Sequence, residues 1–236
     1  MRKPQHKIAN FIYIWCLGSI GFILLLPSMS ALYPESDVDI FSSIVIAQGV
    51  IFTGIYAAIG SVLSKRIGFN SPLISYLLNK DRVIPQVKKQ LIYAIIIGTF
   101  GALIMFLSNS GSIFSSYIGQ FSVIGRLFGA SLYEEIMARW FLMTLLIWIF
   151  WCLFERKTSK PSNLIIWAGL VVSNMLFIVG HYPAVSILIS DNTEIMIMFL
   201  WMFIITVPWG WLYWKFGIES AIVAHAVFHA VFILLS

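Results

Sequence analysis

The sequence has few charged residues and few cysteines for its length. Charged residues make up 11% of the 236 residues and hydrophobic residues 60%, whereas soluble domains carry about 25% charged residues. This number of charged residues is too small to cover a water-facing surface. Most of the surface must therefore face lipid. Both cysteines, Cys16 and Cys152, lie in apolar runs. This placement excludes a disulfide framework and a Cys-x-x-Cys metal site, and it predicts two buried, apolar side chains.

Long apolar runs predict an all-α, polytopic transmembrane helix bundle of about seven to eight spans. One membrane domain would occupy residues 1–236, with no separate soluble domain. The predicted spans are 8–32, 40–64, 90–109, 123–154, 163–189, 194–214 and 218–236. A partial helix near Ser112–Gln120 would be the eighth, and Ser71–Leu78 is expected to lie in the interface. The first run is longer than a signal-peptide core of about 7–15 residues, so we expect it to be retained.

Successive loops between the predicted spans alternate between the two sides of the membrane, and the basic residues lie in the loops of one side. Thirteen of the 15 Lys and Arg follow this pattern: Arg2, Lys3, Lys7, Lys65, Arg66, Lys80, Arg82, Lys88, Lys89, Arg156, Lys157, Lys160 and Lys215. The opposite loops contain only acidic charges: Glu35, Asp37, Asp39, Asp191 and Glu194. Basic loops stay cytoplasmic, which predicts a multi-pass inner-membrane protein with a cytoplasmic N-terminus and an outside C-terminus. The basic residues are therefore topology signals and do not indicate nucleic-acid binding.

Several ionisable residues fall inside the predicted spans: Arg126, Glu134, Glu135, Arg139, His181, Glu219, His225 and His229. A charge at the bilayer centre costs about 2.5–3.5 kcal/mol or more. These residues are therefore expected to pair around a polar cavity near the middle of the spans. For Glu219, the preferred interpretation is a cap at the start of its helix.

The spacing of these residues predicts their local arrangement. Glu135 and Arg139 are four residues apart and can form an ion pair on one helix face. Glu134 is rotated by about 100° from Glu135 and is free for proton transfer. His225 and His229 share a face, where they can chelate a metal or donate two hydrogen bonds to one oxygen.

In order, Glu134-Glu135-x-x-x-Arg139, Phe177-x-x-x-His181 and His225-x-x-x-His229 resemble the three motifs of the CPBP (Abi) family. This family includes type II CAAX prenyl endopeptidases and proteins of bacteriocin processing and immunity. The resemblance covers residues 126–236 and implies an intramembrane endopeptidase. It implies Glu134 as the base that activates water, His181 as a residue that holds this water, and His225 with His229 as oxyanion stabilisers. Glu135, Arg139 and Phe177 would support the site.

The chain departs from the family pattern at His229, where the family often has Asn. This histidine strengthens a zinc alternative in which Glu134, His181, His225 and His229 are the ligands. The helical His-Glu-x-x-His zinc signature is absent, so we favour a metal-free mechanism with no cofactor. The expected partners are the lipid bilayer and a peptide or protein substrate, either lipidated or carrying a leader. Two other functions stay open: a non-catalytic immunity or scaffold protein, and a transporter with a proton relay.

Overall fold

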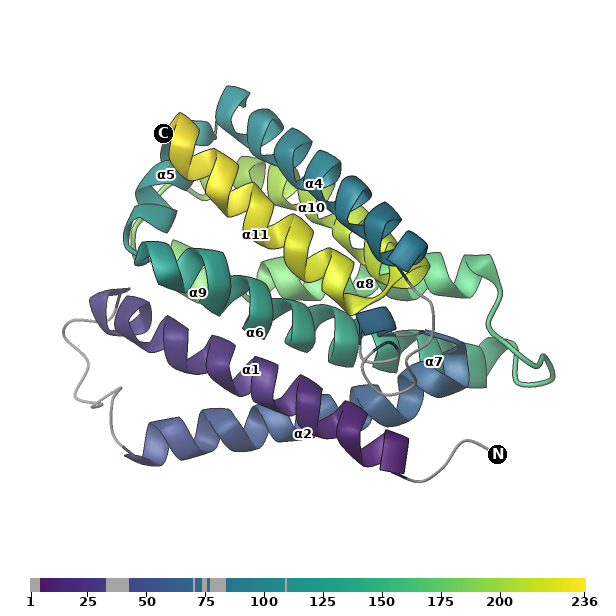
Figure 1. Cartoon of the computed structure of the whole chain (residues 1–236). Helices are drawn as coiled ribbons and strands as arrows, with labels where there is room; N and C mark the ends of the chain where they lie inside the picture. Colours follow the sequence, from purple (N-terminus) through teal and green to yellow (C-terminus); the bar gives the residue numbers. More distant parts are fainter. Residues whose placement is uncertain (1–4, 33–42, 70, 74–75, 77–83, 109) are drawn as a thin grey trace.

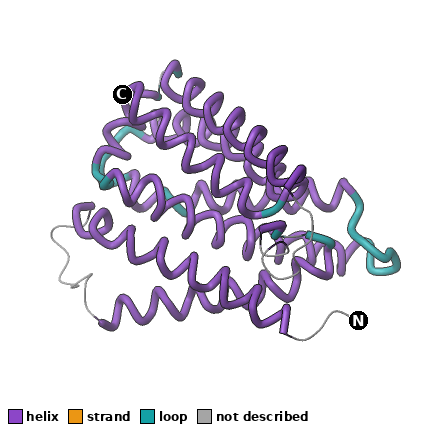
Figure 2. Tube along the Cα trace, in the orientation of Figure 1, coloured by secondary structure: helices purple, strands orange, loops and turns teal. Residues whose placement is uncertain are grey.

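A computed structural model describes the chain except residues 1–4, 33–42, 70, 74–75, 77–83 and 109. The described residues form helices and connecting loops and contain no strand (Figure 2), so the predicted all-α class is confirmed. The helices are α1 (Gln5–Leu32), α2 (Ser43–Ile67), α4 (Ile84–Leu107), α5 (Gly111–Gly119), α6 (Ser131–Glu135), α7 (Thr144–Phe154), α8 (Asn163–Val179), α9 (Tyr182–Val185), α10 (Asn192–Phe216) and α11 (Ile218–Leu235), with π-helical segments η1 (Gly125–Ala130) and η2 (Ile136–Met143). Figure 1 shows them packed into one bundle.

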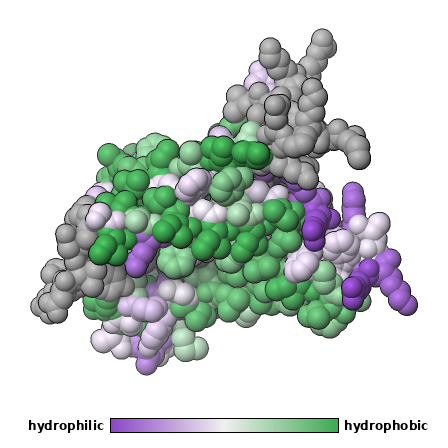
Figure 3. Space-filling view, turned by 90° about the horizontal axis from the view of Figure 1, so that it is seen from below, coloured by the Kyte–Doolittle hydropathy of each residue, from purple (hydrophilic) through white to green (hydrophobic). Residues whose placement is uncertain are grey.

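Seven stretches in the described part are long and apolar enough to cross a bilayer. They are Ile8–Ser30, Ser43–Ile67, Val87–Leu107, Gly125–Phe154, Asn163–Val185, Asn192–Phe216 and Ile218–Leu235. These stretches confirm the seven predicted spans and identify a multi-pass membrane protein. Apolar residues cover most of the face in Figure 3, and hydrophilic residues gather toward its two ends. The short helix α5 lies where the partial helix was expected, whereas half of the expected interfacial segment 71–78 lies outside the described residues.

The predicted burial of the two cysteines is wrong. Cys16 is exposed on α1 and Cys152 is half-buried on α7. In a bilayer, lipid tails are as apolar as the interior of the bundle, so no hydrophobic driving force buries a small apolar side chain between helices. Hydrophobicity alone therefore could not separate lipid-facing from buried positions.

Helices α4 and α11 pack closely because a glycine lies between them. A Cβ atom added at Gly98 of α4 would lie 2.4 Å from the backbone oxygen of Ala224 on α11. Small residues at such contacts allow helix backbones to approach in membranes. The close packing places α11, which carries His225 and His229, against α4.

Gly98→Ala is expected to destabilise the protein because the added methyl group meets backbone, which cannot move aside locally. Overpacking of this kind costs about 1–3 kcal/mol. Gly119→Ala is the matched control, since nothing lies within 4 Å of a Cβ added there. The free energy of unfolding in detergent micelles measures the difference, and equal stability of the two variants would contradict this account of the α4–α11 contact.

Candidate active site

A cavity lies between the helices and contains the predicted catalytic residues. Glu134 from α6, His181 after α8, and His225 and His229 from α11 all line it. The rest of the lining is mostly apolar: Met105, Phe114, Tyr117, Ile118, Phe121, Arg126, Ala130, Phe177, Met202, Ile205, Thr206, Trp209 and Phe228. Three separate helical regions of the chain therefore bring an acid and three imidazoles to one space.

The span that carries the two glutamates is not a uniform α-helix. The single α-turn segment α6 (Ser131–Glu135) lies between the π-helical segments η1 and η2. Wide π turns inside helices occur frequently at functional sites. Glu134 is 21% exposed in the cavity, whereas Glu135 is fully buried. The two adjacent acids thus point into different surroundings, as the rotation of about 100° per residue predicts.

Glu135 forms the predicted ion pair with Arg139 and also binds a histidine. The Arg139 Nε–Glu135 Oε2 distance is 3.4 Å, and both side chains are at most 1% exposed. Glu135 Oε1 accepts a hydrogen bond of 3.0 Å from Nδ1 of His225, and Arg139 Nη2 donates one of 3.1 Å to the Thr206 carbonyl oxygen. The carboxylate therefore connects η2 to α11 and compensates a buried cation. The contact to His225 was not predicted, since spacing along one helix carries no information about a second helix.

Phe177 and His181 form a local unit at the end of α8. His181 Nδ1 lies 2.9 Å from the Phe177 carbonyl oxygen. A carbonyl only accepts, so Nδ1 carries a proton, and the Nε2 of a neutral ring is an acceptor. This Nε2 lies 3.9 Å from Glu134 Oε2. The Phe177 ring meets the His181 ring edge to face at 4.6 Å and lies 5.6 Å from the Arg139 guanidinium carbon.

His181 does not lie in the middle of a span, as the predicted range 163–189 implied. Helix α8 ends at Val179, and His181 lies in the turn before the short helix α9. The turn contains Gly180, and Pro183 stands at the start of α9. Proline favours the first turn of a helix and disrupts a helix interior, so the chain breaks here instead of continuing.

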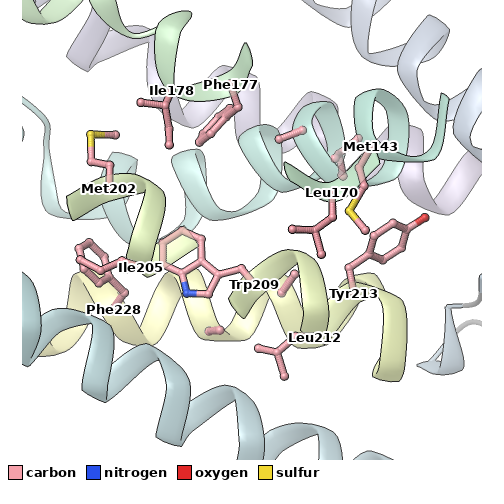
Figure 4. Close-up of a cluster of buried hydrophobic side chains, with 14 of the residues drawn as sticks. Met143, Leu170, Phe177, Ile178, Met202, Ile205, Trp209, Leu212, Tyr213 and Phe228 are labelled. Carbon is pink, nitrogen blue, oxygen red and sulfur yellow. The ribbon is translucent and has the colours of Figure 1, made fainter. Parts of the chain in front are cut away.

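His225 and His229 form a hydrogen bond with each other and do not both point at a third atom. Their Nε2 atoms are 3.1 Å apart. Because His225 Nδ1 donates to Glu135, a neutral His225 must accept at Nε2 the proton that His229 carries. The sequence had predicted that the two rings could chelate a metal or donate two hydrogen bonds to one oxygen, whereas the resting pair has one proton between its two facing nitrogens. The Trp209 indole stacks on the His225 ring at 4.4 Å (Figure 4 shows Trp209 beside Phe228).

Several residues at the site escaped the sequence reasoning. Thr206 accepts from Arg139 through its carbonyl and donates its hydroxyl to Asn174 Oδ1 at 2.8 Å. Trp209 also belongs to this group. These neutral residues lie in apolar runs, where nothing separates them from packing residues. Arg126 was visible as an intramembrane charge, and it lines the cavity with no described hydrogen-bond partner at Nε.

Glu219 does not cap its own helix, so the preferred interpretation is wrong. Helix α11 starts after Gly217, whose φ of 101° is in the left-handed region, and has no side-chain cap. Glu219 Oε1 instead accepts hydrogen bonds from the Ser71 hydroxyl and from the Leu73 backbone N–H at 3.2 Å. The carboxylate therefore joins α11 to the segment before α4 and does not line the cavity.

The histidines do not form a ready zinc site. Within the described part of the chain, no group of three or more His, Cys, Asp or Glu is placed to hold a metal ion. His225 and Glu135 are engaged with each other, and His181 faces Glu134 at 3.9 Å. The four-residue zinc set would therefore need side chains to rearrange before all four could reach one ion at the usual distance of about 2 Å.

A comparison with protein families finds one family model that matches residues 114–231 of the chain. They match the family model described as type II CAAX prenyl endopeptidase Rce1-like. The match covers half of the chain and includes all three motifs and every cavity-lining side chain from α5 to α11. No curated protein and no solved structure matches the chain significantly.

Proposed function

The chain belongs to the type II CAAX prenyl endopeptidase Rce1-like family, and we propose that its cavity hydrolyses a peptide bond within the membrane. The observation that carries this proposal is the position of Glu134 Oε2, 3.9 Å from His181 Nε2 in a cavity. A protease must activate water, and two acceptors at this separation can hold one water molecule. The family supports protease activity in general, and the roles below are specific to this chain.

In this proposal, Glu134 and His181 share the catalytic water. One O–H of the water donates to Glu134, and the other donates to His181 Nε2, which is an acceptor because Nδ1 is held by Phe177. This arrangement leaves an oxygen lone pair for attack on a carbonyl carbon. Glu134 takes the water proton as general base and then transfers it to the amide nitrogen as the C–N bond breaks. The products are a carboxylic acid and an amine, which exchange a proton to become a carboxylate and an ammonium group.

His229 is proposed to stabilise the oxyanion, and His225 is proposed to position the His229 ring. In the resting site, His229 Nε2–H donates to His225 Nε2. A developing oxyanion is a stronger acceptor than a neutral imidazole, so this donor can turn to it at little cost. A second donor from His225 becomes available when the ring is protonated, and the Glu135 carboxylate at 3.0 Å would stabilise that cation.

The apolar lining indicates the kind of substrate. Aliphatic, methionine and aromatic side chains form most of the cavity wall, so a hydrophobic peptide segment would fit better than a charged one. We propose a membrane-associated peptide as the substrate: a leader peptide, a signalling peptide or bacteriocin precursor, or a lipidated tail. Comparing peptide profiles of cells that express the wild type or Glu134→Gln tests processing. Identical profiles would oppose hydrolysis and favour the non-catalytic immunity or scaffold role.

The metal-free mechanism predicts that hydrolysis survives chelation. Because no described group of three ligands is assembled, activity of purified protein after treatment with a zinc chelator is expected to stay close to that of untreated protein. The rate of peptide cleavage before and after chelation is the measurement, and protein treated identically and resupplied with zinc is the control. Loss of activity that zinc restores would support the zinc alternative with Glu134, His181, His225 and His229 as ligands.

A further inference from the structure

We infer that a groove between α1 and α2 binds a phospholipid with an anionic headgroup. The α1–α2 groove is separate from the catalytic cavity, since the two have no lining residue in common. The groove is lined by Ile8, Phe11, Ala58, Ser61, Val62, Lys65 and Arg66. The inference goes beyond the proposed peptidase function and does not depend on it.

Helices α1 and α2 lie side by side and are in direct contact along their middle parts (Figure 1). A Cβ atom added at Gly49 would overlap the Phe22 ring, and one added at Gly54 would lie 3.2 Å from the Trp15 indole nitrogen. The same indole N–H donates a hydrogen bond of 2.8 Å to the Val50 carbonyl oxygen. These pairs run in opposite directions along the two helices, so the first turns of α1 lie beside the last turns of α2. There the close contact gives way to the groove.

The groove has an apolar part and a cationic end. On α2, Ala58, Val62 and Lys65 recur three or four residues apart and therefore share one helix face. Val62 is 56% exposed and Ile8 of α1 is 61% exposed, although both lie in membrane-spanning stretches. Lys65 and Arg66 follow in the last turn of α2 and are exposed. An acyl chain fits the apolar part, and a phosphate group fits the cationic end.

Ser61 gives an independent indication that a ligand is bound. Its side chain is 7% exposed and lines the groove, yet its hydroxyl oxygen has no described hydrogen-bond partner. Burying a hydroxyl without a partner is unfavourable. Ser61 precedes Lys65 by four residues, which corresponds to about 6 Å along the helix. In a phospholipid, the ester carbonyl oxygens lie between the phosphate and the acyl chains. One of them can therefore accept a hydrogen bond from Ser61 while the phosphate contacts Lys65.

The charge of the groove favours an anionic headgroup over a zwitterionic one. Lys65 and Arg66 supply two positive charges, and none of the described residues that line the groove is acidic. The cationic part of a zwitterionic headgroup would be repelled there, whereas basic pockets between transmembrane helices bind phosphate-bearing headgroups. Positive charge that only sets the topology requires neither an adjacent groove nor a buried hydroxyl.

Native mass spectrometry of the full-length protein in detergent tests the proposed ligand. The protein is titrated with phosphatidylglycerol or with phosphatidylcholine that has the same acyl chains. Phosphatidylglycerol is expected to bind more tightly. Equal affinities, or a dimer that forms without bound lipid, would overturn the inference. Thermal unfolding in sodium phosphate and in sodium chloride of equal ionic strength tests the other source of phosphate. The same midpoint is expected, and stabilisation by inorganic phosphate alone would rule out a lipid as the specific ligand.

The variant Lys65→Gln with Arg66→Gln tests the cationic end of the groove. Its affinity for phosphatidylglycerol should fall by about 30-fold, which corresponds to about 2 kcal/mol for the two charges. The matched control is Lys157→Gln with Lys160→Gln, since both lysines are exposed in the loop after α7 and neither lines the groove. The control should bind like the wild type. An equal loss in both variants would show a general charge effect and would contradict a site in the groove.

Ser61→Ala tests the position of the lipid while both positive charges remain. The hydroxyl has no described partner to lose, so the lipid-free protein should unfold at the same temperature as the wild type. The affinity for phosphatidylglycerol should fall by about 2- to 10-fold, the usual effect of losing one hydrogen bond. Wild-type affinity in this variant would overturn the placement of the lipid in the groove. Each measurement is independent of peptide cleavage, so a failure of the proposed hydrolysis would leave these results unchanged.

Discussion

Glu134→Gln is expected to lower the rate of peptide hydrolysis by about 10²–10⁴-fold, the usual contribution of a general base. The amide keeps the size of the carboxylate but cannot accept the water proton. Glu134 has no described partner closer than His181 at 3.9 Å, so the fold should be unaffected. The measurement is cleavage of a hydrophobic peptide by purified protein in lipid, together with thermal unfolding of the same preparations.

The matched control for this variant is Glu194→Gln. Glu194 is exposed in the first turn of α10 and does not line the cavity. The same chemical change there should leave cleavage at the wild-type rate. If Glu134→Gln cleaves as fast as Glu194→Gln, Glu134 is not the base, and the proposed division between the two adjacent acids is wrong.

The sequence was sufficient to predict the fold class and the gathering of four ionisable residues in one cavity. Each apolar run became a helix because backbone groups in lipid must be satisfied within the helix. The Glu135–Arg139 pair followed from helical spacing and is present at 3.4 Å. The cost of charges in lipid predicted that the intramembrane acid and histidines would gather, and Glu134, His181, His225 and His229 line one cavity.

Contacts between helices could not be predicted in the same way. The bond from His225 to Glu135 depends on the rotation of α11 against α6. Nothing in the spacing of one helix encodes the position of another. The π turns on both sides of α6 were also invisible, because a π segment uses the same apolar residues as an α-helix. The hydrogen bonds of Glu219 to Ser71 and Leu73 could not be predicted for the same reason, since these residues lie 148 and 146 positions away in the sequence.

The interhelical bonds give Glu135 a role distinct from that of Glu134. Glu135 is fully buried and compensates Arg139, which is 1% exposed. It also holds the Nδ1 proton of His225, and so directs the Nε2 of that ring toward His229. Stability and the orientation of the oxyanion donors therefore depend on the same carboxylate. Substituting either member of the ion pair should impair both.

Arg139→Met is accordingly expected to destabilise the protein by about 3–5 kcal/mol, because it leaves a buried carboxylate without its cation. Methionine is close to arginine in length and keeps the packing against Phe177. The free energy of unfolding, measured by denaturant titration in mixed micelles, should fall by this amount. Arg156→Met, in the exposed loop after α7, is the control and should unfold like the wild type.

The double variant Glu135→Gln with Arg139→Met separates loss of charge compensation from loss of packing. Removing both charges leaves no uncompensated ion, so this variant should recover much of the stability that Arg139→Met loses. Its rate of peptide cleavage should stay below that of the wild type, since His225 no longer has a carboxylate at Nδ1. If the double variant is as unstable as Arg139→Met alone, the arginine acts through its contacts with Phe177 and the Thr206 carbonyl oxygen, and the buried ion pair contributes little to holding η2 and α11 together.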